Sequence, residues 1–113
     1  MEITIVREYD FVPEWNGNKN DAKPITFKMR RLTTGERDKL IRYKITDNGD
    51  VSIEPDRQGL FLSAVMGIEH LTLNSEPVKL ARDFLTKPGL DNLFIEVVAD
   101  VMGQNSKEDL KNL

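Results

Sequence analysis

The sequence predicts an α+β fold, in which a small antiparallel sheet of N-terminal strands and a hairpin packs with about four helices and the C-terminal half is mostly helical. Residues 2–9 and 24–32 alternate apolar and polar side chains, as half-buried strands do. An Asn48-Gly49 pair between two further alternating runs is typical of a β-hairpin. Beyond residue 56, apolar residues recur with the helical period. The 113 residues suit one domain, 1–113, which can bury a core without disulfides.

The N-terminal third predicts two strands joined by a loop. The first strand, residues 2–9, has one better buried side and fits the edge of a sheet. Residues 11–23 contain Pro13, Gly17 and several polar turn formers, which favour a flexible loop with Trp15 as its one large apolar anchor. Residues 24–32 then form a half-buried strand with a basic outer row.

The middle of the chain predicts a helix and a hairpin. Thr33 and Glu36 have the spacing of a capping box, so a helix should begin at Thr34 and run to about Tyr43. Residues 44–53 alternate around Asn48-Gly49, a pair that tolerates positive φ at both central positions of a hairpin turn.

Three helices are expected in the C-terminal half. Asp56 is a candidate N-cap for a helix over 57–70, where Gly59 and Gly67 suggest close approach of another element. Ser75 and Pro77 open the next helix, and Pro88 the last, which Gly103 should end. Residues 104–113 are mostly polar and predict a frayed tail. The apolar face of the last helix comprises Leu90, Leu93, Phe94, Val97, Val98, Val101 and Met102.

Catalytic chemistry is poorly represented in the sequence. There is no Cys, and His70, the only histidine, follows no nucleophile motif; it is expected at a helix C-terminus. Residues 47–50 resemble part of a calcium loop, but the Gly comes too early and the terminal Glu is missing. No phosphate-binding loop or dinucleotide fingerprint occurs. We therefore expect neither an enzyme nor a bound cofactor or metal.

The N-terminus and the hydropathy pattern favour a cytoplasmic protein. MEITIV lacks the basic region of a signal peptide, and no apolar stretch approaches the ~20 residues of a membrane span.

Charge is distributed unevenly along the chain. The net charge is −3, yet residues 19–44 contain nine Lys or Arg and only three acidic residues. This segment predicts a solvated basic face, a patch that docks onto an acidic neighbour such as another copy of the chain, or a small nucleic-acid-binding regulator. The acidic composition and the scarcity of interleaved aromatics weigh against nucleic acid. The candidate basic face consists of Lys28, Arg30, Arg37, Lys39 and Arg42.

The order of elements and several short motifs resemble the small tail assembly chaperones of long-tailed bacteriophages. The motifs are RLTTGE at 31–36, IEHL at 68–71, Phe84-Leu85, Pro88-Gly89-Leu90 and Lys111-Asn112. The resemblance implies a non-catalytic α+β protein of the bacterial host cytoplasm that self-associates. It also implies that the chain binds the tape measure protein, a long and aggregation-prone helical client, until tail tube subunits polymerise around it.

Apolarity, and not a motif, indicates which residues would bind such a partner. In the last helix, Ile95 and Met102 widen the apolar arc to more than half the circumference, so a second chain could dock at its margin. Ordinary core packing is the alternative role for every candidate. The candidates are Trp15, Phe61, Met66, Ile95 and Met102.

Overall fold

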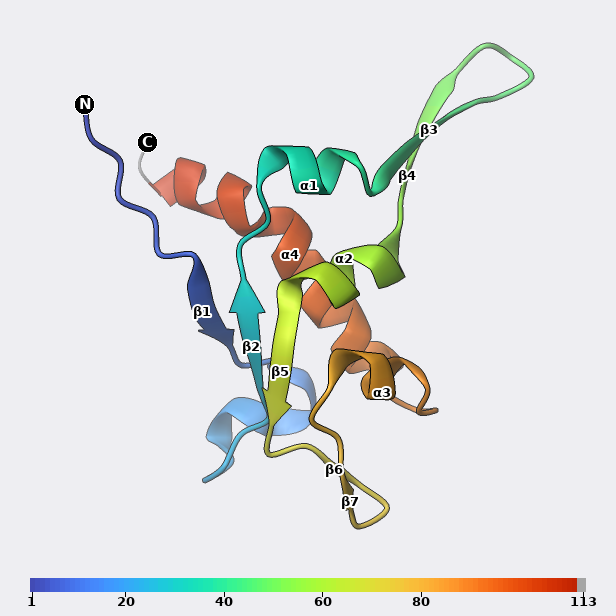
Figure 1. The fold of residues 1–113 in the computed structure, drawn as a ribbon. Helices are drawn as coiled ribbons and strands as arrows, with labels where there is room; N and C mark the ends of the chain where they lie inside the picture. The colour runs from blue at the N-terminus through green and yellow to red at the C-terminus, as the bar shows by residue number, and fades with distance from the viewer. Residues whose placement is uncertain (112–113) are drawn as a thin grey trace.

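A computed structural model describes the backbone of residues 1–111 and the side chains of residues 1–103, and it has the expected α+β architecture (Figure 1). In chain order the elements are β1 (Glu8–Phe11), the 3₁₀ helix η1 (Trp15–Asn20), β2 (Thr26–Arg30), α1 (Thr34–Asp38), β3 (Ile41–Ile45), β4 (Val51–Pro55), α2 (Arg57–Ala64), β5 (Val65–Glu69), β6 (Thr72–Leu73), β7 (Glu76–Pro77), α3 (Ala81–Leu85) and α4 (Asp91–Lys111).

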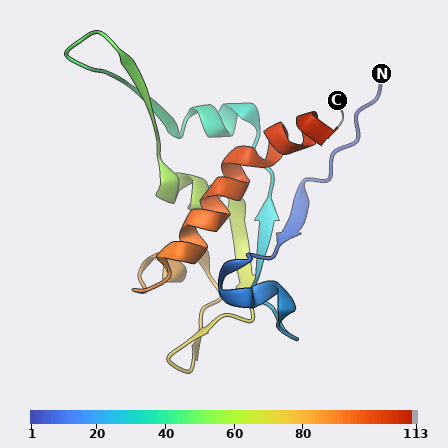
Figure 2. The same ribbon diagram turned by 180° about the vertical axis from the view of Figure 1, so that it is seen from behind.

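The central sheet is antiparallel and has the order β1-β2-β5, so β1 is an edge strand, as predicted. In β2, Phe27 pairs with Phe11 on one side and with Ile68 on the other. One face of the sheet is covered by α4, which lies behind the strands in Figure 1 and in front of them in Figure 2. The hairpin β3-β4, which we expected to join this sheet, forms a separate two-stranded sheet.

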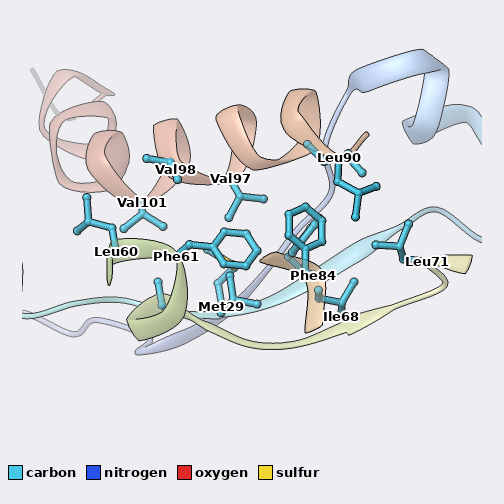
Figure 3. Packing of buried hydrophobic residues seen from close by; sticks show 14 of the residues in the cluster. Met29, Leu60, Phe61, Ile68, Leu71, Phe84, Leu90, Val97, Val98 and Val101 are labelled. Atoms are coloured by element: carbon cyan, nitrogen blue, oxygen red, sulfur yellow. The ribbon is translucent and has the colours of Figure 1, made fainter. Parts of the chain in front are cut away.

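The core lies between the covered face of the sheet and helices α2, α3 and α4 (Figure 3). Phe61 is at its centre, with its ring 4.9 Å from that of Phe84, 5.4 Å from that of Phe94 and 6.2 Å from that of Phe27 (centroid distances). The apolar face predicted for the last helix is buried, except for Phe94, which is only partly buried, and Met102, which is exposed.

The N-terminal segment differs from the prediction in two ways. The strand expected over residues 2–9 begins only at Glu8, because residues 2–6 have no neighbouring strand to pair with. The segment 11–23 contains the helix η1, whose buried Asn18 accepts a hydrogen bond from the Ile25 amide and donates to the carbonyls of Pro13 and Ile25. Its flexibility stays a prediction.

The capping box of Thr33 and Glu36 is present, but the helix expected to reach Tyr43 ends at Asp38. The β-branched and aromatic residues from Ile41 alternate with basic ones, and this period of two favours a strand over a helix. The predicted hairpin forms, with a different turn. Gly49 alone adopts positive φ, at 83°, after a turn closed by a hydrogen bond from the Gly49 amide to the Thr46 carbonyl.

The helix expected over 57–70 ends at Ala64, and residues 65–69 form β5 instead. Backbone pairing with β2 and burial of Val65 and Ile68 against the core outweigh the helical pattern. His70 is therefore not a helix C-terminal residue. It has φ 63°, and its Nδ1 lies 3.1 Å from the Pro24 carbonyl oxygen.

The last two helices are also displaced from their predicted ends. The helix expected from Ser75 begins at Ala81, because Glu76–Pro77 pairs with Thr72–Leu73 in a short hairpin. Helix α4 begins at Asp91 and continues through Gly103, so the predicted stop at Gly103 is wrong. The predicted frayed tail, 104–113, lies outside the residues whose side chains are described.

The molecule is more extended than a compact domain of its length. Its radius of gyration is 16.0 Å, whereas about 13 Å is typical of 100 residues. The N-terminal arm, residues 1–7, and the β3-β4 hairpin project from the body in both views (Figures 1 and 2), and they account for this extension.

Candidate partner-binding surface

An apolar groove runs along the outer side of α4. One hollow of about 220 Å³ is lined by Phe94, Ile95, Val98, Ala99 and Met102, with Arg57 at its rim. A second hollow, of about 210 Å³, lies between α1, α2, α4 and the start of the hairpin, and Met102 lines it as well. We call the first hollow, with its continuation across Met102 to Ile41, the α4 groove. Apart from Arg57, the walls of the first hollow are aliphatic and aromatic side chains, whereas the continuation is also lined by Thr34, Arg37 and Asp38.

The groove is open because α4 carries more apolar surface than one core can cover. Leu93 and Val97 face the core and are almost fully buried, whereas Ile95 is 57% exposed and Met102 44% exposed. The arc predicted from the sequence therefore has both a buried centre and an exposed margin.

The β3-β4 hairpin carries a second uncovered apolar surface. Three cross-strand pairs place only apolar side chains on one side: Ile41 with Pro55, Tyr43 with Ile53, and Ile45 with Val51. The intervening pairs, Arg42 with Glu54 and Lys44 with Ser52, lie on the opposite side. We call the first side the hairpin face. Its four outer members, Tyr43, Ile45, Val51 and Ile53, are each between 63% and 75% exposed.

The total exposed area agrees with two uncovered surfaces. The chain has an accessible surface of 8250 Å², whereas a compact folded protein of 12.9 kDa is expected to have about 6,300 Å². This excess includes the exposed N-terminal residues 1–7 as well as the two surfaces.

Of the five residues predicted to bind a partner, the structure brings only Ile95 and Met102 together. Phe61 is fully buried and belongs to the core. Met66 is exposed on β5 and lines neither hollow of the α4 groove. Trp15, on η1, is 38% exposed and lines a separate polar hollow with Asn18 and His70.

The predicted basic face is divided. Lys28 contacts Asp10 at 2.9 Å and Glu69 at 3.7 Å, and the hydrogen bond to Asp10 raises the pKa of this lysine. Arg30 Nε donates to the Ser63 carbonyl oxygen at 2.6 Å, and its guanidinium also pairs with Glu36. These two side chains are engaged within the fold. The other three members, Arg37, Lys39 and Arg42, surround the start of the hairpin.

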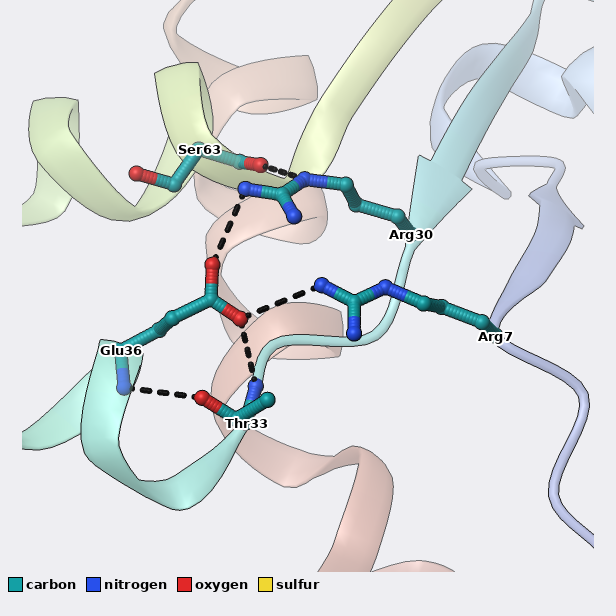
Figure 4. Close-up of polar contacts among 5 residues, drawn as sticks. All are labelled: Arg7, Arg30, Thr33, Glu36 and Ser63. Carbon is teal, nitrogen blue, oxygen red and sulfur yellow. Dashed lines mark hydrogen bonds and ion pairs between the residues drawn. The ribbon is translucent and has the colours of Figure 1, made fainter.

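Glu36 joins four segments of the chain (Figure 4). It accepts from the Thr33 amide at 3.0 Å, completing the capping box, and contacts Arg30 at 3.1 Å and Arg7 at 3.3 Å. The backbone hydrogen bond from Thr33 is the main cause that holds the pKa of this carboxyl below its usual range, and both arginines add to it. Because Arg30 also binds Ser63, the contacts fix α1 against β2, α2 and the N-terminal arm.

One further buried polar contact has a structural role. The Tyr9 hydroxyl donates to Asp100 at 2.7 Å and so joins β1 to α4. Burial, followed by the bond to Asp100, raises the pKa of Tyr9 far above its ordinary value. The contact is not part of either hollow of the α4 groove.

The described residues offer little for other classes of site. No three His, Cys, Asp or Glu side chains among them gather as metal ligands. Within the same part of the chain, no helix has both the length and the apolarity needed to cross a membrane.

The hairpin face was missed by sequence reasoning. The two-residue turn expected at Asn48-Gly49 would pair Ile45 with Ser52 and place the apolar residues of the two strands on opposite sides. The observed turn is one residue longer and pairs Ile45 with Val51, which places these residues on one side. The expectation of a helix to Tyr43 removed β3 from this pairing.

No family model, curated protein or solved structure matches this chain.

Proposed function

We propose that this protein is a non-catalytic tail assembly chaperone that binds the tape measure protein of a long-tailed phage and self-associates. The client site is the α4 groove. The observation that carries the proposal is the exposure of Ile95 and Met102 in one hollow on the same side of a helix whose opposite side is core. The phage client is the one that the motif resemblance implies.

The groove fits an apolar-striped helix in size and chemistry. A helix docks in this way by placing residues at i, i+3, i+4 and i+7 into an apolar channel while its polar side stays in water. The channel has Ile95 and Met102 nearly two helical turns apart along α4, with Val98 and Ala99 between them. Such a surface recognises an apolar stripe and not one sequence, which suits a client that presents a long repeated stripe. The thioether of Met102 adapts to different side chains.

Coexpression with a tape measure protein tests this proposal. The wild-type chain should keep the client in the supernatant and copurify with it. Ile95→Asn combined with Met102→Asn should release the client into the pellet while leaving the melting temperature of the chaperone unchanged. Leu62→Asn combined with Leu80→Asn is a matched control, since these two side chains are 48% and 43% exposed and line neither hollow of the groove. Equal loss of the client with both pairs of substitutions would refute the assignment.

A nucleic-acid-binding role is the alternative, and the ion pairs of Lys28 and Arg30 do not favour it. On our proposal, DNA and RNA give no salt-dependent shift in a gel, even at low ionic strength.

A further inference from the structure

We propose that the hairpin face binds the hairpin face of a second copy of this chain, with the two hairpins antiparallel about a two-fold axis. The inference deepens the proposed function, on which it rests for self-association, by assigning that property to the exposed side of the hairpin, which meets the client groove at Ile41.

The hairpin needs a cover that its own chain does not supply. A two-stranded hairpin alone is marginally stable in water, yet this one projects from the body and exposes Tyr43, Ile45, Val51 and Ile53 (Figures 1 and 2). Its polar side is internally matched, since Lys44 lies 3.7 Å from Glu54. The apolar side is therefore the one that gains from a partner.

The chemistry of the face suits a copy of itself. A two-fold interface brings identical patches together, so any charge in the patch would meet its like. The hairpin face contains no charged residue. Each of its four exposed side chains, at 63% to 75% exposure, retains about 130 Å² of surface, so covering all of them on two copies removes about 1,000 Å². This is close to the lower limit for a specific interface and predicts a dimer that depends on concentration.

The charges at the two ends of the hairpin select the antiparallel arrangement. The tip, residues 46–50, has Asp47 and Asp50 and no basic residue. At the base, Arg37 and Asp38 line a hollow with Ile41, and Arg57 lines another with Pro55, Glu54 and Asp56. Of these carboxylates, Glu54 is paired with Lys44 and Asp56 accepts from the Gly59 amide. No ion pair engages Arg37 or Arg57 within the described part of the chain.

Two stacked hairpins can be related by an axis along the strands or across them. An axis along the strands would bring the two acidic tips together, which like charges disfavour. An axis across the strands places the tip of each copy over the basic base of the other. Each strand has five residues and spans about 17 Å, so tip and base within one copy are too far apart to pair with each other.

Sedimentation equilibrium of the purified chain without client tests the inference. The wild type should be a dimer that dissociates on dilution. Ile53→Asn, which alters both halves of the interface, should weaken the dimer roughly 100-fold or more. Leu62→Asn also replaces an apolar side chain, but one outside the hairpin, and should leave the dimer intact. Far-UV circular dichroism and the melting temperature should show that both variants stay folded.

Charge reversal tests the arrangement. A tip variant, Asp47→Lys with Asp50→Lys, and a base variant, Arg37→Glu with Arg57→Glu, should each weaken the dimer roughly tenfold. Mixing the two variants should restore it, because each lysine tip then meets a glutamate base. The proposal is overturned if the wild type stays monomeric, if Ile53→Asn leaves the dimer intact, or if mixing the two charge variants does not restore the dimer. It is also overturned if the hairpin face becomes covered only when client is added. These results involve no client binding at the groove, so a failure here leaves the proposed function standing. A chain that forms the dimer but does not keep the client in the supernatant would refute only the proposed function.

Discussion

Replacing Phe61 with Ala tests whether the packing of α2, α3, α4 and the sheet depends on one aromatic cluster. Phe61 is fully buried, stacks on Phe84 with ring centroids 4.9 Å apart, and also contacts Phe27 and Phe94. Truncating a buried Phe to Ala costs about 3–5 kcal/mol, and aromatic neighbours place this site at the upper end of that range. Since domains of this size unfold with about 5–15 kcal/mol, the variant should lose a third or more of its stability.

Urea denaturation followed by far-UV circular dichroism measures this loss. Leu62→Ala is the matched control on the same helix, because Leu62 is 48% exposed and should cost less than about 1 kcal/mol. In a thermal scan, Phe61→Ala should lower the melting temperature by roughly 15 °C or more. A loss below about 1.5 kcal/mol, or equal losses for the two variants, would show that Phe61 is not at the centre of the core.

Three further substitutions test local contacts. Tyr9→Phe should cost about 1 kcal/mol near neutral pH, because Asp100 loses a donor at 2.7 Å. The wild type should also lose stability as pH rises above about 10, since the pKa of Tyr9 is raised in the fold and the unfolded chain releases that proton first. Urea midpoints against pH should show a shallower decline for Tyr9→Phe, and identical slopes would contradict the burial of this hydroxyl. Asp56→Ala should cost about 1 kcal/mol in a urea melt, because its side chain caps α2 by accepting from the Gly59 amide at 3.0 Å, whereas Asp56→Asn should cost little. Gly59→Ala should destabilise the protein in the same assay despite its better helix propensity, since a Cβ there would lie 2.6 Å from Asp56 Oδ2 and 2.8 Å from Leu40 Cδ2; a gain in stability would refute this close approach.

The elements predicted correctly are those set by local chemistry. The capping box of Thr33 and Glu36, the N-cap at Asp56 and the hairpin around Gly49 each depend on residues a few positions apart, and all three occur, although the hairpin has another turn than the one predicted. Close approach was expected at both Gly59 and Gly67, and it occurs at Gly59, where an added Cβ would lie 2.8 Å from Leu40 Cδ2. At Gly67 the nearest atom, the Lys79 carbonyl oxygen, would be 3.8 Å away, an ordinary contact distance.

The elements predicted wrongly are those set by distant partners. Residues 65–69 have a helical apolar pattern, yet they form β5 because β2 offers an unpaired edge beside them. Residues 2–6 have a strand pattern but no strand beside them, so they remain unpaired. Neither outcome depends on the segment's own sequence, since a strand is stabilised by the neighbour that pairs with it.

The candidate surface was predictable only in part, because some of its residues lie in a regular helix and the exposure of others depends on where neighbouring elements begin and end. Ile95 and Met102 were found from helical period alone, because α4 is regular over the relevant turns. Phe61 and Met66 could not be separated by pattern, since their exposure depends on where α2 ends and β5 begins. The hairpin face required correct strand bounds before its one-sided apolar pattern became visible.

Methyl spectra of methionine test the central claim, that client helices dock in the α4 groove, most directly. The chain has four methionines, of which Met102 lines the groove, Met29 is buried, and Met1 and Met66 are exposed elsewhere. With [¹³C-methyl]methionine in the chain, a peptide carrying an apolar-striped segment of a tape measure protein is titrated into the purified protein. The Met102 resonance should shift in proportion to the bound fraction, while those of Met1 and Met66 stay in place. A shift at Met66 with none at Met102, or no shift at any methionine at saturating peptide, would contradict the assignment of the groove.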